Sequence, residues 1–161
     1  MAGRTPALLA LQRAQVPYSI HEYRHDPRVR GFGQESAAAL GRSPDEVHKT
    51  LLALVDGEPL VAIVPVSGQL DLKALAAAAD GRRAEMAPIA MAERLTGYVV
   101  GGISPIGQRR ALPTYLDEEA ILFDKVYVSA GQRGLSLGLA PQDLLSITGA
   151  RLAPIARHGP A

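Results

Sequence analysis

The chain has 161 residues, of which 47% are hydrophobic and 20% are charged, with a formal net charge of +1. This balance excludes global disorder and fits one domain over residues 1–161, because a single core is comfortable at that size. The absence of cysteine excludes disulfides, thiolate metal sites and a cysteine nucleophile.

In the first half of the chain, caps, glycines and alternation mark the expected elements. Thr5 caps a helix with Pro6 at its first position, where the missing N–H costs nothing. Asp56-Gly57 predicts a hairpin, because both positions tolerate a positive φ. In chain order we expect a helix from Thr5, a strand over 16–23, a helix over 36–40 ending at Gly41, a helix start at 43–46, and hairpin strands over 50–55 and 59–66.

The second half alternates short helices with short strands. Asp71 caps an alanine-rich helix, and Gly97 ends another. We expect helices over 72–79 and 91–95 and from Pro141, strands over 83–86, 98–100, 125–129, 134–140 and 151–156, and a frayed tail at 157–161. Strands outnumber helices, are interleaved with them and are partly joined as hairpins. The predicted fold is therefore α/β: a single domain with a mixed, partly antiparallel, barrel-like β-sheet flanked by helices.

Residues 21–25 read HEYRH, which spells the H-E-x-x-H motif of zinc proteases. That chemistry needs both histidines one helical turn apart on one face. Here the motif ends an alternating strand, where four residues span about 13 Å, and Pro27 disfavours a helical Asp26. We therefore expect no metal and no cofactor. His48 and His158 have no partners at a recognisable spacing and are expected to be surface or half-buried imidazoles.

Lys49 is the first candidate for chemistry. It lies between a turn over 43–47 and an apolar strand, so its ammonium should emerge near a sheet end. A lysine there can hold a phosphate or a developing oxyanion, or act as a base when it is desolvated. The same position also suits a lysine that merely extends its head to solvent.

The stretch over 97–113, GYVVGGISPIGQRRALP, is too rich in glycine and proline for a regular element. Gly101 and Gly102 can present free backbone N–H groups to an oxyanion, and one such donor is typically worth about 3 kcal/mol in a transition state. The alternative is a bulge that ends a strand. A second glycine-rich turn contains Ser129, Gly131, Arg133 and Gly134 but has no P-loop spacing. No serine lies in a G-x-S-x-G elbow, so the pattern indicates backbone donors and one lysine, without an evident protein nucleophile.

Four segments in order carry a family resemblance: HKTLL at 48–52, PVSGQLDLKAL at 65–75, TGYVVGGISPIGQRRALPTYLD at 96–117 and YVSAGQRGLSL at 127–137. Together they resemble the YbaK branch of the YbaK/ProX aminoacyl-tRNA editing family, whose members include bacterial Cys-tRNA(Pro) deacylases. The resemblance runs from Thr5 to about Ala156. It implies a mixed α/β editing domain that hydrolyses the ester joining a misplaced amino acid, chiefly cysteine, to tRNA(Pro).

The resemblance also implies roles for individual residues. Lys49 falls on the family's active-site lysine, and Gly101 and Gly102 fall on the glycines of its GGxSP loop. Substrate-binding positions fall on Tyr23, Phe32, Thr50, Ser104, Pro105, Ser129, Gly131 and Arg133. Many relatives carry an aspartate where this chain has Ser136, which puts in doubt any role of that carboxylate in orienting the lysine or the substrate amine.

The residues and the family resemblance indicate the same mechanism, in which the substrate is an ester that is already activated. A pocket that orients the carbonyl and stabilises the oxyanion can suffice without a covalent enzyme intermediate. In the family the thiol of a cysteinyl substrate is thought to attack its own carbonyl, which fits a chain without cysteine. We expect the Gly101 and Gly102 N–H groups to hold the carbonyl oxygen, and Lys49 and Thr50 to bind the terminal adenosine or its phosphate.

Two other functions fit the same sequence. A module that binds tRNA or a synthetase without hydrolysis is favoured by Ser136, and a deacylase for alanine or another small residue would share the scaffold. The expected partners are charged tRNA, through its 3′ aminoacyl-adenosine end, and prolyl-tRNA synthetase. No secretory leader and no membrane-length apolar run is recognisable, so we expect a cytoplasmic protein with no membrane association.

Overall fold

Short helices and strands alternate along this chain, and one long loop over 97–113 joins α4 to β6. The computed structural model describes residues 4–29 and 31–158. The helices are α1 (Pro6–Ala14), α2 (Phe32–Leu40), α3 (Leu72–Ala78), α4 (Ile89–Thr96), α5 (Pro141–Thr148) and the short 3-10 helix η1 (Glu118–Leu122). The strands are β1 (Ser19–Glu22), β2 (His48–Val55), β3 (Glu58–Pro65), β4 (Gly68–Leu70), β5 (Ala84–Met86), β6 (Thr114–Asp117), β7 (Val126–Gln132), β8 (Leu135–Leu139), β9 (Arg151–Ala153) and β10 (Ala156–His158).

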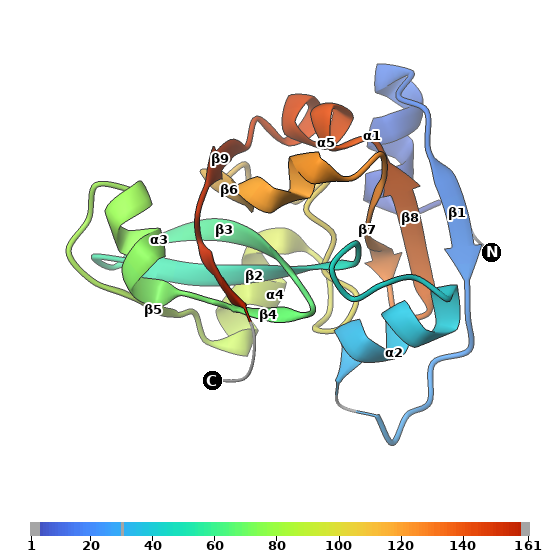
Figure 1. Ribbon diagram of the computed structural model, residues 1–161, viewed down its shortest axis with the longest axis horizontal. Coiled ribbons are helices and arrows are strands. Elements are labelled where there is room, and N and C mark those ends of the chain that lie inside the picture. The colour runs from blue at the N-terminus through green and yellow to red at the C-terminus, as the bar shows by residue number, and fades with distance from the viewer. Residues whose placement is uncertain (1–3, 30, 159–161) are drawn as a thin grey trace.

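The strands form a mixed arrangement, as predicted. A five-stranded sheet has the order β5-β2-β3-β6-β9, in which β2 and β3 are antiparallel while β3, β6 and β9 are parallel neighbours. A three-stranded sheet, β1-β8-β7, lies beside it with α1 (Figure 1), and β10 pairs with β4. An isolated bridge between Val47 and Tyr127 connects the two larger sheets. The described strands thus form three sheets, of which the largest is mixed.

Both faces of β3 are buried, which explains its unbroken apolar sequence. Val61 and Ile63 pack into a core with α1, β7, β8 and α5. Ala62 and Val64 face the opposite way and pack with Leu75 of α3. The central strand therefore joins two layers of apolar side chains and fixes the position of its neighbour, β2.

The local signals that the sequence gives most strongly are confirmed. Thr5 and Asp71 accept hydrogen bonds from the N–H groups of Leu8 and Ala74 and cap α1 and α3. Asp56 and Gly57 join β2 to β3 with φ values of 49° and 85°. Two consecutive positive values are what a tight two-residue hairpin turn requires.

Several predicted boundaries are wrong. Residues 98–100 form no strand, because that segment turns back on itself, with the Gly102 N–H donating to the Val99 carbonyl at 2.8 Å. Residues 43–46 make a single turn rather than a helix, since the chain enters β2 directly at His48. The first strand is shorter than 16–23, and α2 begins at Phe32, upstream of the predicted residue 36.

The C-terminal segment also differs from its prediction. Residues 151–156 break into β9 and the start of β10, and β10 extends through His158 by pairing with β4. The predicted fraying is therefore wrong for 157–158, while 159–161 lie outside the described residues. The short elements β4, β6 and η1 were not predicted. Within the described ranges, no helix has the length and apolar character needed to cross a bilayer.

Candidate active site

The main pocket opens where one edge of β2 has no strand partner. On one side, β2 pairs with β3 along its full length. On the other side, it pairs with β5 only over Ala53–Val55, and the Ala87 N–H continues this contact to the Leu52 carbonyl. Because main-chain groups alternate in direction along a strand, the N–H and C=O of Thr50 face the same side as that carbonyl. The gap between β5 and β7 therefore exposes main-chain groups of β2 to a pocket of about 410 Å³.

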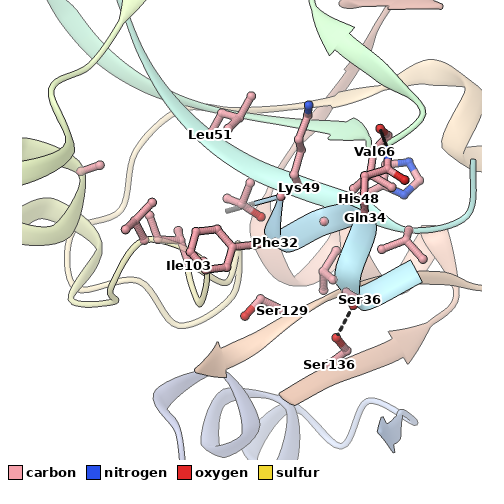
Figure 2. Close-up of a pocket in the computed structure, with 18 of the residues that line it drawn as sticks. Phe32, Gln34, Ser36, His48, Lys49, Leu51, Val66, Ile103, Ser129 and Ser136 are labelled. Atoms are coloured by element: carbon pink, nitrogen blue, oxygen red, sulfur yellow. Dashed lines mark hydrogen bonds between the residues drawn. The ribbon is translucent and has the colours of Figure 1, made fainter. Parts of the chain in front are cut away.

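Six of the predicted site residues line this pocket together, although they come from segments far apart in the chain. They are Tyr23, Phe32, Lys49, Thr50, Gly101 and Ser129. The volume lies within the range of small-molecule sites. The remaining walls are largely apolar, with Leu51, Val66 and Ile103 among them (Figure 2).

Lys49 is half-buried at the start of β2, as predicted from its place after the turn. Its side chain points to the same side of the strand as Leu51 (Figure 2). Burial lowers the pKa of the ammonium, and no carboxylate of the described residues pairs with it. This group can therefore act as an unneutralised cation for an anionic oxygen, or give up its proton more readily than an exposed lysine.

Thr50 has an unsatisfied hydroxyl. Its Oγ1 is buried and has no hydrogen-bond partner among the described residues. A buried hydroxyl without a partner is costly, so such a group in a pocket wall indicates a place for a ligand atom. Thr50 therefore contributes main-chain groups to the free edge of β2 and an unpartnered hydroxyl that is buried in the pocket wall.

Phe32 forms a wall of the pocket and is held from two sides. A Cβ on Gly101, where φ is +87°, would come within 2.7 Å of the Phe32 ring, so only glycine permits this contact. The guanidinium of Arg133 lies 5.1 Å from the ring centroid, and its Nε donates to the Val100 carbonyl at 2.8 Å. Arg133 itself is exposed and does not line the pocket. It connects the β7–β8 turn to the glycine loop and supports Phe32.

The other predicted residues of the two glycine-rich segments support the loop instead of lining the pocket. Gly102 is packed against the backbone of Gln132, and its N–H is used by the Val99 carbonyl, so this geometry does not support the expected oxyanion contact. Ser104 is fully buried and accepts the Ile106 N–H. Pro105 is likewise buried. Gly131 lies near the end of β7, where the register shifts between Ser129 and Gln132, and its N–H donates to Ser129 Oγ at 3.1 Å.

Ser136 lies on the pocket wall formed by β8 and is 3% exposed. Its hydroxyl is 3.0 Å from that of Ser36 on α2, and this contact joins the helix to the sheet (Figure 2). Sequence reasoning missed Ser36, which has no distinctive motif. The only signal was the departure at position 136, which indicated that its surroundings had changed.

The histidines do not form a common site. His21 contacts Ser19 Oγ and His25 contacts Glu35, so the HEYRH residues face different partners, as the strand interpretation requires. His48 was expected at or near the surface, but it is buried because β2 begins there, and its Nδ1–H donates to the Glu46 carbonyl at 3.1 Å. Burial is the main cause of its lowered pKa, so the ring is neutral near pH 7.

His158 lies at the surface, as predicted, and it pairs with Glu119. With Asp117 these residues place three ligand-type atoms within 4.8 Å of one another. However, Oδ1 of Asp117 already accepts the N–H groups of Ile155 and Ala156. These contacts hold the start of β10 in place, while Glu119 and His158 pair with each other.

Comparison with known proteins places this fold and pocket in a family. The model of the aminoacyl-tRNA editing domain matches residues 26–147, which contain almost the entire pocket. The chain belongs to the aminoacyl-tRNA editing domain family. This assignment confirms the resemblance read from the sequence.

Individual relatives of this editing domain agree with that assignment. The chain is 37% identical over 153 residues to EbsC of Enterococcus faecalis, provisionally named a Cys-tRNA(Pro)/Cys-tRNA(Cys) deacylase, covering 94% of this chain and 93% of EbsC. It is 30% identical over 111 residues to the proline–tRNA ligase of Maridesulfovibrio salexigens, covering 65% of this chain and 19% of the ligase. A solved structure provisionally described as a trans-editing enzyme for prolyl-tRNA synthetase has a TM-score of 0.82 at 24% identity, covering 94% of this chain and 95% of its own. That last likeness concerns the fold.

Proposed function

We propose that this editing domain acts in trans as a deacylase that hydrolyses mischarged Cys-tRNA(Pro), and that Cys-tRNA(Cys) is a further candidate substrate. The observation that carries the proposal is the combination, in one pocket, of an unpaired lysine, an unsatisfied threonine hydroxyl and an exposed strand edge. None of these groups has a partner among the described residues, and a bound ester with its adenosine could supply one. The name of EbsC supports the choice of cysteine.

In the proposed mechanism, the pocket orients the ester and the substrate supplies the nucleophile. The cysteinyl sulfur attacks its own carbonyl carbon, the bond to the ribose oxygen breaks, and that oxygen takes up a proton. Water then opens the resulting thiolactone to free cysteine. This route requires no nucleophile from a chain that contains no cysteine.

The protein groups have separate tasks in this route. Gly101 is the remaining candidate for the backbone donor to the carbonyl oxygen, since it lines the pocket while Gly102 does not. Lys49 and Thr50 bind the terminal adenosine or its phosphate, where the half-buried ammonium has a stronger interaction than it would have in water. Phe32 limits the side-chain space.

The proposal is tested by deacylation of Cys-tRNA(Pro), with Ala-tRNA(Pro) and Pro-tRNA(Pro) in parallel, by the wild type and Lys49→Ala. We expect cysteine-selective release that falls at least 100-fold in the variant, because the only lysine lining the described pocket has been removed. Lys73→Ala, an exposed lysine on α3, is the matched control and should keep full activity. Unchanged turnover by Lys49→Ala would contradict the assignment of that residue.

Two alternatives have distinct outcomes in the same assay. Selective release of alanine would indicate a deacylase for that small residue instead. No release of any amino acid from a folded sample would favour a module that binds charged tRNA or prolyl-tRNA synthetase without hydrolysis. Adding prolyl-tRNA synthetase to each reaction tests whether that enzyme is a partner that supplies tRNA selectivity.

A further inference from the structure

The ionisable side chains that line the pocket include a cation but no carboxylate. Among the described lining residues, the side chains that can carry charge are Lys49, His48 and Tyr23, and no aspartate or glutamate is present. His48 is buried and donates one ring N–H to a backbone carbonyl. The pocket therefore contains one cation and no anion to balance it.

Four carboxylates on elements around these walls have other contacts or line another cavity. Glu35, on the same helix as Phe32, lies 2.7 Å from His25 and also accepts the Asp26 N–H. Glu93 of α4 accepts the Val100 N–H at 2.9 Å. Asp45 and Asp117 line a different cavity on the other side of His48. None of these groups lines the main pocket.

The wall formed by α2 and β8 is polar but neutral. Ser36 and Ser136 are 7% and 3% exposed, and their hydroxyls contact each other at 3.0 Å. Two hydroxyls can donate to or accept from a neutral group, but they cannot replace a counter-ion for a buried ammonium. A substrate with a charged amine would therefore share the pocket with Lys49, and no carboxylate of the described lining residues would balance the two charges.

We infer that this pocket binds the aminoacyl group with its α-amino group uncharged, and that it accepts mercaptoacyl groups lacking the amine altogether. The inference rests on the proposed function, because it concerns the same pocket and the same substrate end. It extends the substrate class from α-aminoacyl to neutral thiol-bearing acyl groups. It also gives a physical consequence to the serine at position 136.

Binding of two stable adenosine amides tests the inference without requiring hydrolysis. One carries cysteine on a 3′-amino-3′-deoxyadenosine, and the other carries 3-mercaptopropionic acid, which lacks the amine. Both Kd values are measured by calorimetry at pH 6.0 and pH 8.5, and the ratio of the two cancels changes in the protein that affect both complexes alike. An α-amino group titrates near 7.7–8.0, so exclusive binding of the free base would make the cysteinyl compound roughly 50-fold weaker, relative to its partner, at the lower pH.

The expected result is a relative weakening of at least tenfold at pH 6.0. A ratio that does not change with pH, or tighter binding of the cysteinyl compound at pH 6.0, would overturn the inference while leaving the proposed function intact. If neither compound binds at either pH, the proposed function fails and the inference fails with it. The two failures are therefore distinguishable.

Introducing a carboxylate provides a second measurement. Ser136→Asp should reduce the pH dependence of the ratio by at least threefold, since it supplies a counter-ion within the pocket wall. Ser136→Asn is the matched control of similar size, and it should keep the wild-type ratio. Thermal melting establishes that each variant is folded, and an equal change in both variants would count against a role for charge.

Discussion

Thr50 allows stability and function to be separated by one substitution. Replacing it with valine exchanges the buried, unpartnered Oγ1 for a methyl group of similar size. Burial of a hydroxyl without a hydrogen bond costs about 1–3 kcal/mol in proteins, so Thr50→Val should raise the free energy of unfolding by that amount. For a chain of this size, each kcal/mol raises the melting temperature by about 2–4 °C.

The same substitution should weaken catalysis. A neutral hydrogen bond contributes about 0.5–1.5 kcal/mol net, so its loss lowers kcat/KM for Cys-tRNA(Pro) by about 3- to 10-fold. Urea unfolding and deacylation are measured on the same preparations of wild type, Thr50→Val and Thr50→Ser. The serine variant keeps the hydroxyl and should keep most of the activity.

Ser67 is the matched control, because its Oγ is also buried without a partner but does not line the main pocket. Ser67→Ala removes an unsatisfied hydroxyl and should leave kcat/KM unchanged. A Thr50→Val protein that is less stable than the wild type would refute the reasoning about the hydroxyl. One that is more stable but fully active would show that no ligand atom uses it.

Three further predictions concern the loop and its supports. Gly101→Ala should lower the free energy of unfolding in urea by about 1–3 kcal/mol and reduce activity at least tenfold, because its Cβ would meet the Phe32 ring. Gly57→Ala is the control: its φ of +85° gives the same backbone strain, but open space surrounds it, so this variant should stay active. Arg133→Lys should lower kcat/KM about 3- to 10-fold. Arg42→Lys is the control and should keep its activity, because the Arg42 guanidinium lies 5.3 Å from the Tyr127 ring and Arg42 does not line the pocket. Equal losses in the two variants would contradict a specific support for Phe32. Burial raises the pKa of Tyr98 from 10.0 to about 12, so on raising the pH the unfolded chain loses this proton first. The free energy of unfolding should therefore fall between pH 10 and pH 12, and it should fall less in Tyr98→Phe. Identical pH profiles of the two proteins would exclude this cause.

Signals confined to neighbouring residues were reliable guides to the fold. The caps at Thr5 and Asp71 and the turn at Asp56-Gly57 are decided by local backbone chemistry, and each was predicted correctly. The apolar run over 98–100 was misread as a strand because a strand also needs a partner. Here the chain folds onto its own loop, and Tyr98 donates its hydroxyl to the Ile106 carbonyl instead.

The site was predictable only in part for a related reason. Lys49 could be identified because a charged residue followed directly by an apolar strand is recognisable in the sequence alone. Which residues meet it depends on tertiary packing, so the sequence could not separate Gly101, which lines the pocket, from Gly102, which packs against the β7–β8 turn. The Ser36–Ser136 contact spans 100 positions and has no local signature.

The unpaired edge of β2 has a consequence for how such a site can change over generations. Main-chain N–H and C=O groups are present whatever side chain the codon specifies, so most substitutions along this edge leave them in place. Only proline, or an insertion that shifts the register, removes them. The amino-acid preference of the pocket can therefore drift through residues such as Phe32 and Ser136, while the part of the site made by the strand itself is inherited unchanged.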